Sequence, residues 1–246
     1  MKKIIGIISG KGGVGKTTLT SNIALALHNY QEEVIAIDVD LKNPTLGFHL
    51  GVKDYDVTIS DVLNDNYSIY EALHIHPTGL KYFPASLSIS HLNTDLTKLK
   101  ELIDDMKGYV ILDSPPGLSQ DVFHILNAST DILVVTTPDL PSLAGCLRTL
   151  ELARYLKKNV LGVVLNKVES KRYEIDPLEI EALCNTKILG IIPLDQSVTE
   201  SLLKEIPLIH YKPFSPASME ITKIAAYIAG KKYKKPSLLR RWFWFK

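Results

Sequence analysis

A glycine-rich segment directly after the first apolar run carries the clearest chemistry in the sequence. Residues 10–17 read Gly-Lys-Gly-Gly-Val-Gly-Lys-Thr, which fits the phosphate-binding pattern G-x-x-x-x-G-K-[ST]. In such a loop, backbone N–H groups surround a phosphate, Lys16 supplies a cation for the β- and γ-oxygens, and the Thr17 hydroxyl ligates Mg²⁺. A turn that is merely rich in glycine is the alternative, but the position between a strand pattern and a helix pattern disfavours it. The motif therefore predicts a nucleotide site that includes Gly10, Gly12, Gly13, Val14, Gly15, Lys16 and Thr17.

A phosphate site also needs acids that support the metal ion and orient water, and three aspartates follow apolar runs. Asp113 ends the run 109–113, whereas Asp38 and Asp40 follow the run 34–37. The carboxyl ends of parallel strands meet at one edge of a sheet, so we expect these carboxylates beside the glycine-rich loop. Each aspartate taken alone could instead cap a helix or face solvent. Together with the loop, the three aspartates weaken this alternative and favour acids that support a metal ion and orient water at a phosphate site.

Short β-branched apolar runs alternate with longer segments of helical periodicity. The runs are continuously apolar, which indicates strands covered on both faces, as in a mostly parallel sheet with helices on each side. The sequence thus predicts a doubly wound α/β fold. Strands are expected at 4–8, 34–37, 109–112, 132–135, 160–165 and 188–192, and helices at 17–29, 94–106, 142–157 and 215–229. Residues 44–84 are expected to form the least regular insertion.

The composition agrees with one soluble globular domain. The chain has 246 residues, of which 46% are hydrophobic and 22% charged, and this length can build one large core. No apolar run approaches the ~18 residues that a spanning helix needs. Cys146 and Cys184 match neither a CxxC nor a zinc-binding spacing. Together with the lack of a secretory pattern at Met1, they favour a reduced cytosolic protein.

Charge is segregated along the chain. Residues 231–246 hold seven of the 28 basic side chains and none of the 27 acidic ones. Residues 1–230 therefore carry 21 basic against 27 acidic side chains, a net charge of −6, and the tail carries +7. This pattern argues against a body that holds nucleic-acid backbone and places any anionic partner at the C-terminal end.

The motifs resemble those of one family. Lys11 before two glycines gives Lys-Gly-Gly-Val-Gly-Lys-Thr-Thr, which is similar to the deviant Walker A motif of the MinD/ParA ATPases. The segments 38–40 (Asp-Val-Asp) and 113–117 (Asp-Ser-Pro-Pro-Gly) resemble that family's switch I and switch II. Residues 189–197 resemble its adenine-side segment. The resemblance runs from residue 3 to about residue 229, is closest to the MinD branch, and implies a P-loop NTPase fold.

The resemblance implies roles for individual residues. Lys16, Thr17 and Thr18 would hold the phosphates of ATP and Mg²⁺. Lys11 would reach across an ATP-dependent homodimer to the nucleotide of the partner. The remaining roles are water orientation by Asp40, support of Mg²⁺ by Asp38 and Asp113, sensing of the γ-phosphate by the Gly117 N–H, and adenine contacts from Asn166, Pro193 and Asp195. Asn166 has an alternative as a turn residue at the end of a strand.

The chain departs from the family pattern at one place. Many MinD relatives carry an aspartate shortly after the strand that ends here at Thr136-Thr137. This chain reads Ser-Leu-Ala-Gly-Cys at 142–146, with no acid beside Gly145. We therefore expect the usual partner of Lys11 to be missing.

The last ten residues have the composition of a helix that lies in a membrane surface. With Ser237 as N-cap and about 100° per residue, the apolar side chains fall within an arc of about 160°. Arg240 and Arg241 lie outside this arc and could reach lipid phosphates. A terminal helix that docks on the protein or on a partner is the alternative. The apolar stripe comprises Leu238, Leu239, Trp242, Phe243 and Phe245.

Three segments are expected from these patterns: an ATPase domain (1–230), a basic linker (231–236) and an amphipathic helix (237–246) that targets an anionic membrane surface. The predicted function is a MinD-like ATP hydrolase, peripheral on the inner face of the cell membrane, that acts in spatial positioning such as division-site placement. An activator or cargo protein is expected as well, although no motif identifies it.

Other classes are weighed against this prediction. A ParA-like ATPase that partitions DNA or cargo is the main alternative, which the acidic body and the aromatic stripe disfavour. An ATP-switched regulator with little turnover stays open. An iron–sulfur carrier would need closely spaced cysteines, so the separation of Cys146 from Cys184 argues against it.

Overall fold

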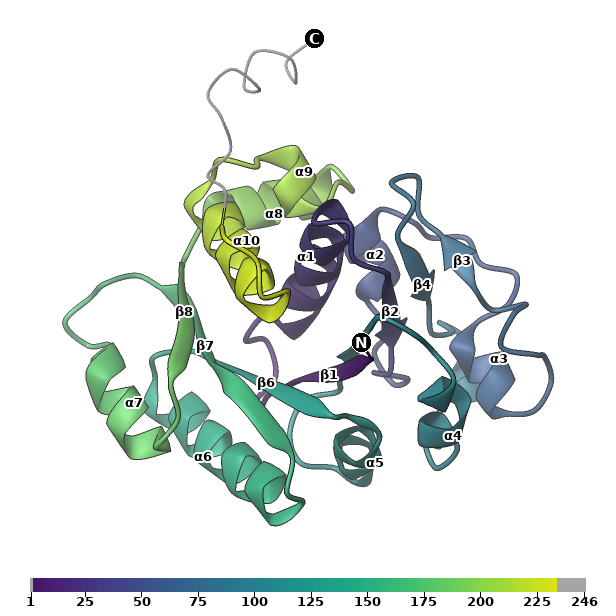
Figure 1. Cartoon of the computed structure of the whole chain (residues 1–246), viewed down its shortest axis with the longest axis horizontal. Helices are drawn as coiled ribbons and strands as arrows, with labels where there is room; N and C mark the ends of the chain where they lie inside the picture. The colour runs from purple at the N-terminus through teal and green to yellow at the C-terminus, as the bar shows by residue number, and fades with distance from the viewer. Residues whose placement is uncertain (1, 234–246) are drawn as a thin grey trace, which may run out of the picture.

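A computed structural model describes residues 2–233 and shows an eight-stranded sheet between two layers of helices (Figure 1). The strand order is β3-β4-β2-β5-β1-β6-β7-β8, and all neighbours are parallel except β3 and β4. The strands are β1 (Lys3–Ile8), β2 (Val34–Asp38), β3 (His74–Ile75), β4 (Lys81–Phe83), β5 (Tyr109–Asp113), β6 (Asp131–Thr136), β7 (Asn159–Val168) and β8 (Ile188–Pro193).

The helices cover both faces of the sheet. Figure 1 shows α1, α2, α8, α9 and α10 on one face and α3 to α7 on the other. Their bounds are α1 (Lys16–Asn29), α2 (Leu46–Leu50), α3 (Ile59–Leu63), α4 (Leu99–Asp104), α5 (Gln120–Ala128), α6 (Leu140–Tyr155), α7 (Pro177–Cys184), α8 (Gln196–Leu203), α9 (Leu208–Tyr211) and α10 (Pro216–Ile228), with a 3₁₀ turn η1 (Ile89–His91).

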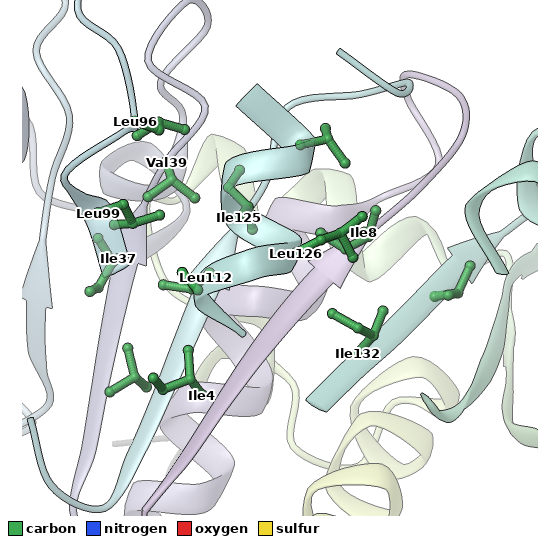
Figure 2. Close-up of a cluster of buried hydrophobic side chains, with 14 of the residues drawn as sticks. Ile4, Ile8, Ile37, Val39, Leu96, Leu99, Leu112, Ile125, Leu126 and Ile132 are labelled. Carbon is green, nitrogen blue, oxygen red and sulfur yellow. The ribbon is translucent and has the colours of Figure 1, made fainter. Parts of the chain in front are cut away.

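Two hydrophobic cores follow from the alternation of side chains along each strand. In β1, Ile4 and Ile8 face the layer that holds α4 and α5, whereas Ile5 and Ile7 face α1 and α10. Figure 2 shows the first of these cores, where Leu99, Ile125 and other apolar side chains cover β1, β2 and β5. Burial on both faces explains why the central strands are continuously apolar in sequence.

Helix α1 is the innermost helix of its layer. Ten of its 14 residues are buried, because α2, α9 and α10 pack around it. Its first turn follows Gly15 directly, at the carboxyl edge of the sheet. Helix caps at the same edge come from Ser119 for α5, Asp139 for α6 and Asp195 for α8.

The predicted doubly wound α/β fold is confirmed, and all six expected strands are present. The helix expected at 94–106 is shorter, because Asp95 accepts a hydrogen bond from the Thr97 N–H in a turn and the helix starts at Leu99. Residues 44–84 are more regular than expected, since they form α2, α3, β3 and β4. Within residues 2–233, no helix has the length and apolar character needed to span a membrane. The tail helix expected at 237–246 and residues 234–236 of the expected linker lie outside the described residues.

Candidate functional site

The glycine-rich loop turns from β1 into α1. Gly13 and Gly15 have φ values of 76° and 98°, in the left-handed region that glycine adopts without strain. A Cβ atom on Gly15 would also lie 2.3 Å from Nδ2 of Asn166. Both backbone and packing therefore require glycine at position 15, where the N-terminal end of α1 offers a phosphate site.

Two donors from the end of β7 hold the loop. The Asn166 side-chain amide donates to the Val14 carbonyl at 2.7 Å, and Lys167 Nζ donates to the Gly13 carbonyl at 2.6 Å. Asn166 is buried and lines the cavity described below, and its contact with adenine stays a prediction. Lys167 was not predicted as a site residue, although the Asn-Lys pair at the end of an apolar run could have indicated it.

Helix α6 supports the loop from the other side. A Cβ atom on Gly10 would lie 2.3 Å from the backbone of Gly145, and a Cβ atom on Gly145 would lie 2.9 Å from the backbone of Gly10. The two glycines thus allow direct contact between the start of the loop and α6. Any shift of α6 at this point must move the loop with it.

Lys16 and Asp113 form the buried charged part of the site. Lys16 is 8% exposed, and its pKa is lowered by burial, against the opposing effect of Asp113 and Asp40. Burial raises the pKa of Asp113 to about 6, although hydrogen bonds from Thr17 and Thr20 and the Lys16 charge lower it. A phosphate or metal ion that enters the site would relieve the cost of these buried charges.

The donors present fit Mg²⁺. Asp113 Oδ1 accepts a hydrogen bond from Thr20 at 2.9 Å, whereas Oδ2 is buried without a partner among the described residues. The Thr17 hydroxyl is near enough to the Asp113 carboxylate to lower its pKa. Residues 2–233 contain no group of three His, Cys, Asp or Glu side chains that could bind a metal ion unaided. This is compatible with Mg²⁺, which takes many of its ligands from phosphates and water.

Asp38 shapes the segment that follows β2. Its Oδ2 accepts hydrogen bonds from the N–H groups of Thr45 and Leu46 at 3.0 and 2.9 Å, and Oδ1 accepts from the N–H of Asp40 at 3.2 Å. Burial and the neighbouring Asp113 raise its pKa well above the ordinary value. The role of Asp38 beside Mg²⁺ stays a prediction. Its hydrogen bonds hold the backbone of residues 39–46 in place, and we call these residues the switch I segment.

Asp40 is the more accessible of the two. It is half-buried, lines the cavity and accepts a hydrogen bond from the N–H of Asn43 at 3.2 Å. Burial raises its pKa, while Asn43 and Lys16 lower it. A carboxylate at this position can accept a hydrogen bond from water near the phosphate end of the cavity.

Gly117 lies in a tight turn after β5. Its φ is 82°, and its N–H donates to the Ser9 carbonyl at 3.0 Å. Sensing of a γ-phosphate by this N–H would require exchange of the bond to Ser9. The Gly117 N–H is therefore engaged within the chain, and its contact with a γ-phosphate stays a prediction.

Lys11 has an acidic partner, so the expectation that its partner is missing is wrong. Lys11 Nζ lies 3.2 Å from Asp139 Oδ1. Asp139 also caps α6 by accepting hydrogen bonds from the N–H and hydroxyl of Ser142. Despite partial burial, these bonds and those from Thr137 and Lys11 hold the pKa of Asp139 at about 2. Asp139 lies six residues before Gly145. The sequence indicates it as a helix N-cap, because an aspartate is followed there by Leu and Pro.

A cavity of about 490 Å³ lies beside the loop, within the usual size range of ligand sites. One end is polar, and the other is walled by Ile192, Leu194, Val198 and Ile221. The cavity brings together Gly12, Gly13, Gly15, Lys16, Thr17, Thr18, Asp40, Asn166, Pro193 and Asp195. Gly10, Lys11, Val14, Asp38, Asp113 and Gly117 support or flank it instead.

Asp195 is already engaged at this cavity. Its Oδ1 accepts from the N–H of Ser197 at 2.9 Å, and Oδ2 accepts from the N–H of Ala217 at 3.2 Å. One carboxylate thus joins the starts of α8 and α10 and fixes the apolar wall. Direct contacts of Asp195 and Pro193 with adenine stay predictions.

Cys146 of α6 and Cys184 of α7 lie with their sulfur atoms 3.9 Å apart, and both are free and buried. Their separation in sequence was misleading, because α6 and α7 pack against each other. Both thiols lie in the interior of the chain, with 0% and 1% of the two residues exposed, so neither is accessible to an external cluster. The pair therefore gives no support to an iron–sulfur carrier.

Comparison with known proteins agrees with this geometry. The ParA family model, described as NUBPL iron-transfer P-loop NTPase, matches residues 1–229. An uncharacterised ATP-binding protein of Methanocaldococcus jannaschii is 35% identical over 231 residues, which cover 92% of this chain and 88% of that protein.

Two solved structures are similar over nearly the whole chain. The cell division ATPase MinD of Pyrococcus furiosus has a TM-score of 0.89 and 31% identity, with 94% of this chain and 99% of that chain covered. The septum site-determining protein MinD of Pyrococcus horikoshii, complexed with Mg-ADP, has a TM-score of 0.89 and 29% identity, with coverage of 93% and 96%. Such neighbours agree with ATP and Mg²⁺ as the cofactors of the site.

Proposed function

This chain belongs to the ParA family of P-loop NTPases, and from that membership we propose that it is a MinD-like ATP hydrolase that dimerises on ATP and docks on a membrane. The observation that carries the proposal is the convergence of Lys16, Thr17 and the orphaned Asp113 oxygen at the glycine-rich loop. In this site Lys16 holds the β- and γ-phosphates, Thr17 and Asp113 hold Mg²⁺, and Asp40 orients the attacking water. Mg²⁺, when bound, neutralises charge on the phosphate oxygens.

The position of Lys11 supports the proposed dimerisation. Its side chain is 48% exposed and is paired with Asp139 at the surface. An exposed pair of this kind is worth only ~0.2–1 kcal/mol, so a phosphate from a second subunit can displace it. Because that exchange needs the γ-phosphate, association would depend on ATP rather than ADP.

Membrane docking rests on the tail predicted from sequence. Partial burial of its apolar stripe contributes ~1–1.5 kcal/mol per large side chain, and each basic residue near anionic lipid adds roughly 1 kcal/mol. Ordering the backbone opposes these gains by ~1–2 kcal/mol per residue. One tail is therefore marginal, whereas two tails on a dimer can gain about 10²–10⁴-fold through bivalent binding. Hydrolysis would separate the dimer and release it from the inner face of the cell membrane.

The proposed task is spatial positioning, such as division-site placement, with an activator or cargo protein as a further partner. The division into an ATPase domain (1–230), a basic linker (231–236) and an amphipathic helix (237–246) is part of this proposal. A ParA-like partition ATPase remains the competing function, because the same fold could hold duplex DNA through the basic tail.

The test is co-sedimentation of the full chain with liposomes that contain an anionic lipid, with ADP or with a slowly hydrolysed ATP analogue. Binding that requires the analogue is expected, and removal of residues 237–246 should abolish it while nucleotide binding stays. A tail with the same residues in an order that breaks the stripe is the matched control and should bind poorly. Lipid binding that survives the deletion would refute the membrane role. Binding to duplex DNA but not to lipid, at the same salt, would favour partition.

A further inference from the structure

The switch I segment (39–46) is fastened at two points besides Asp38. At one end, the Thr45 hydroxyl donates to the Thr17 hydroxyl, with 3.2 Å between the oxygens. In the middle, Lys42 Nζ lies 2.9 Å from Asp121 Oδ2. Thr17 belongs to α1 and Asp121 to the first turn of α5, and these helices cover opposite faces of the sheet (Figure 1). The segment therefore crosses the carboxyl edge of the sheet and joins the two layers.

The contact at Thr17 involves the oxygen that the proposed function assigns to Mg²⁺. A hydroxyl has one proton and two lone pairs. The Thr45 proton occupies one lone pair of the Thr17 oxygen, so the second lone pair remains for a metal ion. Thr45 Oγ1 lies 3.2 Å from the oxygen that would ligate the metal ion, so a change at this oxygen acts directly on Thr45.

The contact at Asp121 connects the segment to switch II. Asp121 is 23% exposed and lies four residues after Gly117. Asp40 is two residues from Asp38 and two from Lys42, and it is near enough to Asp121 and Lys42 for their charges to affect its pKa. The position of Asp40 is therefore set between an anchor on β2 and an anchor on α5.

We propose that Thr45 and Lys42 are positioning residues that couple the metal site to both switches. Thr45 adds a hydroxyl beside Thr17 and transmits metal binding to the switch I segment. Lys42 transmits the position of that segment to α5 through Asp121. The inference rests on the proposed function for the identity of the metal ion, and it assigns two side chains a role beyond the family motifs.

The Thr45 contact is tested with Thr45→Val, which keeps the shape of the side chain but removes its hydroxyl. The measurement is the Mg²⁺ concentration that half-maximally slows release of a fluorescent ADP analogue from the full chain. Loss of a partner next to a metal ligand is expected to raise this concentration about tenfold. Thr45→Ser should restore it, and affinity for the analogue in EDTA should not change.

Thr222→Val is the matched control, because that hydroxyl bonds to the Ser218 carbonyl within α10. An unchanged Mg²⁺ response in Thr45→Val would overturn the role of Thr45 alone. A wild-type chain whose nucleotide release ignores Mg²⁺ would overturn the proposed function, and this inference with it.

The Lys42 contact is tested by charge exchange and hydrogen exchange. In the wild type, the ATP analogue with Mg²⁺ should slow amide exchange in both 39–46 and 117–123. In Lys42→Asp the protection should remain in 39–46 and be lost in 117–123, and the double variant Lys42→Asp, Asp121→Lys should recover it. Protection of both segments in Lys42→Asp, or its absence from 117–123 in the wild type, would overturn the coupling.

Discussion

Lys11 is held by Asp139 of its own chain, with 3.2 Å between Nζ and Oδ1, at the point where Asp139 also caps α6. One carboxylate therefore serves both a helix start and the lysine that is proposed to act across a dimer. The resting pair has to open before Lys11 can contact another subunit.

Asp139→Asn should make dimerisation easier. Asparagine is as good an N-cap as aspartate, so α6 should keep its start while the ion pair is lost. Each exposed pair is worth ~0.2–1 kcal/mol and a dimer has to open two of them, so the dimer should form at a protein concentration about 2- to 30-fold lower with the ATP analogue. Sedimentation velocity can measure this shift.

Lys11→Ala should instead lose ATP-dependent dimerisation, and normal dimerisation of that variant would contradict the cross-subunit role.

Gly145→Ala should weaken nucleotide binding. In most exposed helix positions this change stabilises a protein by roughly 0.5–1 kcal/mol. Here the added Cβ would lie 2.9–3.0 Å from the backbone of Gly10, so the glycine-rich loop must move. We expect at least a tenfold rise in the Kd for ATP, measured by calorimetry, while Ala144→Ser on the exposed face of α6 should bind normally. Unchanged affinity would show that α6 can yield at this contact.

Asp40→Ala should slow hydrolysis without removing nucleotide binding. Positioned acid–base groups typically contribute about 10²–10⁴-fold to a rate, and Asp40 is the cavity-lining aspartate nearest that role in the proposal. Phosphate release should therefore fall by at least about 10²-fold, and the ATP-bound dimer should accumulate in size-exclusion chromatography. A wild-type protein that itself releases almost no phosphate would indicate an ATP-switched regulator.

His49 should make stability depend on pH. Burial lowers its pKa from 6.5 to about 4, so between these values the unfolded chain binds more protons than the folded one. Above pH 6.5 the full contribution of neutral His49 to the free energy of unfolding is present. It is lost as the pH falls toward 4, and the loss is about 1.4 kcal/mol at pH 5.5. Urea unfolding should show that the free energy of unfolding decreases less between pH 8 and pH 5.5 for His49→Gln than for the wild type. Equal decreases would show that other groups cause the pH dependence.

Local patterns in the sequence were sufficient for six of the eight strands and for the glycine-rich loop, whereas the short strands β3 and β4 were missed. Continuous apolar runs identify β1, β2 and β5 because burial on both faces excludes polar residues, and the loop is defined by neighbours in the chain. The pairs Lys11–Asp139 and Cys146–Cys184 were missed because they depend on how α6 packs, which no local pattern reports. The contacts of Thr45 and Lys42 join segments 28 and 79 residues apart and were missed for the same reason.

The burial of α1 also determines where the molecule can be mobile. Because its neighbours enclose this helix, the amides of its middle turns should be among the last to exchange with deuterated solvent. Lys16 and Thr17 therefore belong to a helix that is already ordered before ATP binds. Little conformational entropy is lost at the phosphate end when the nucleotide binds. The adaptable parts of the site are then the segments around Asp40 and Gly117, which are the places where rearrangement between the ADP-bound and ATP-bound states is expected.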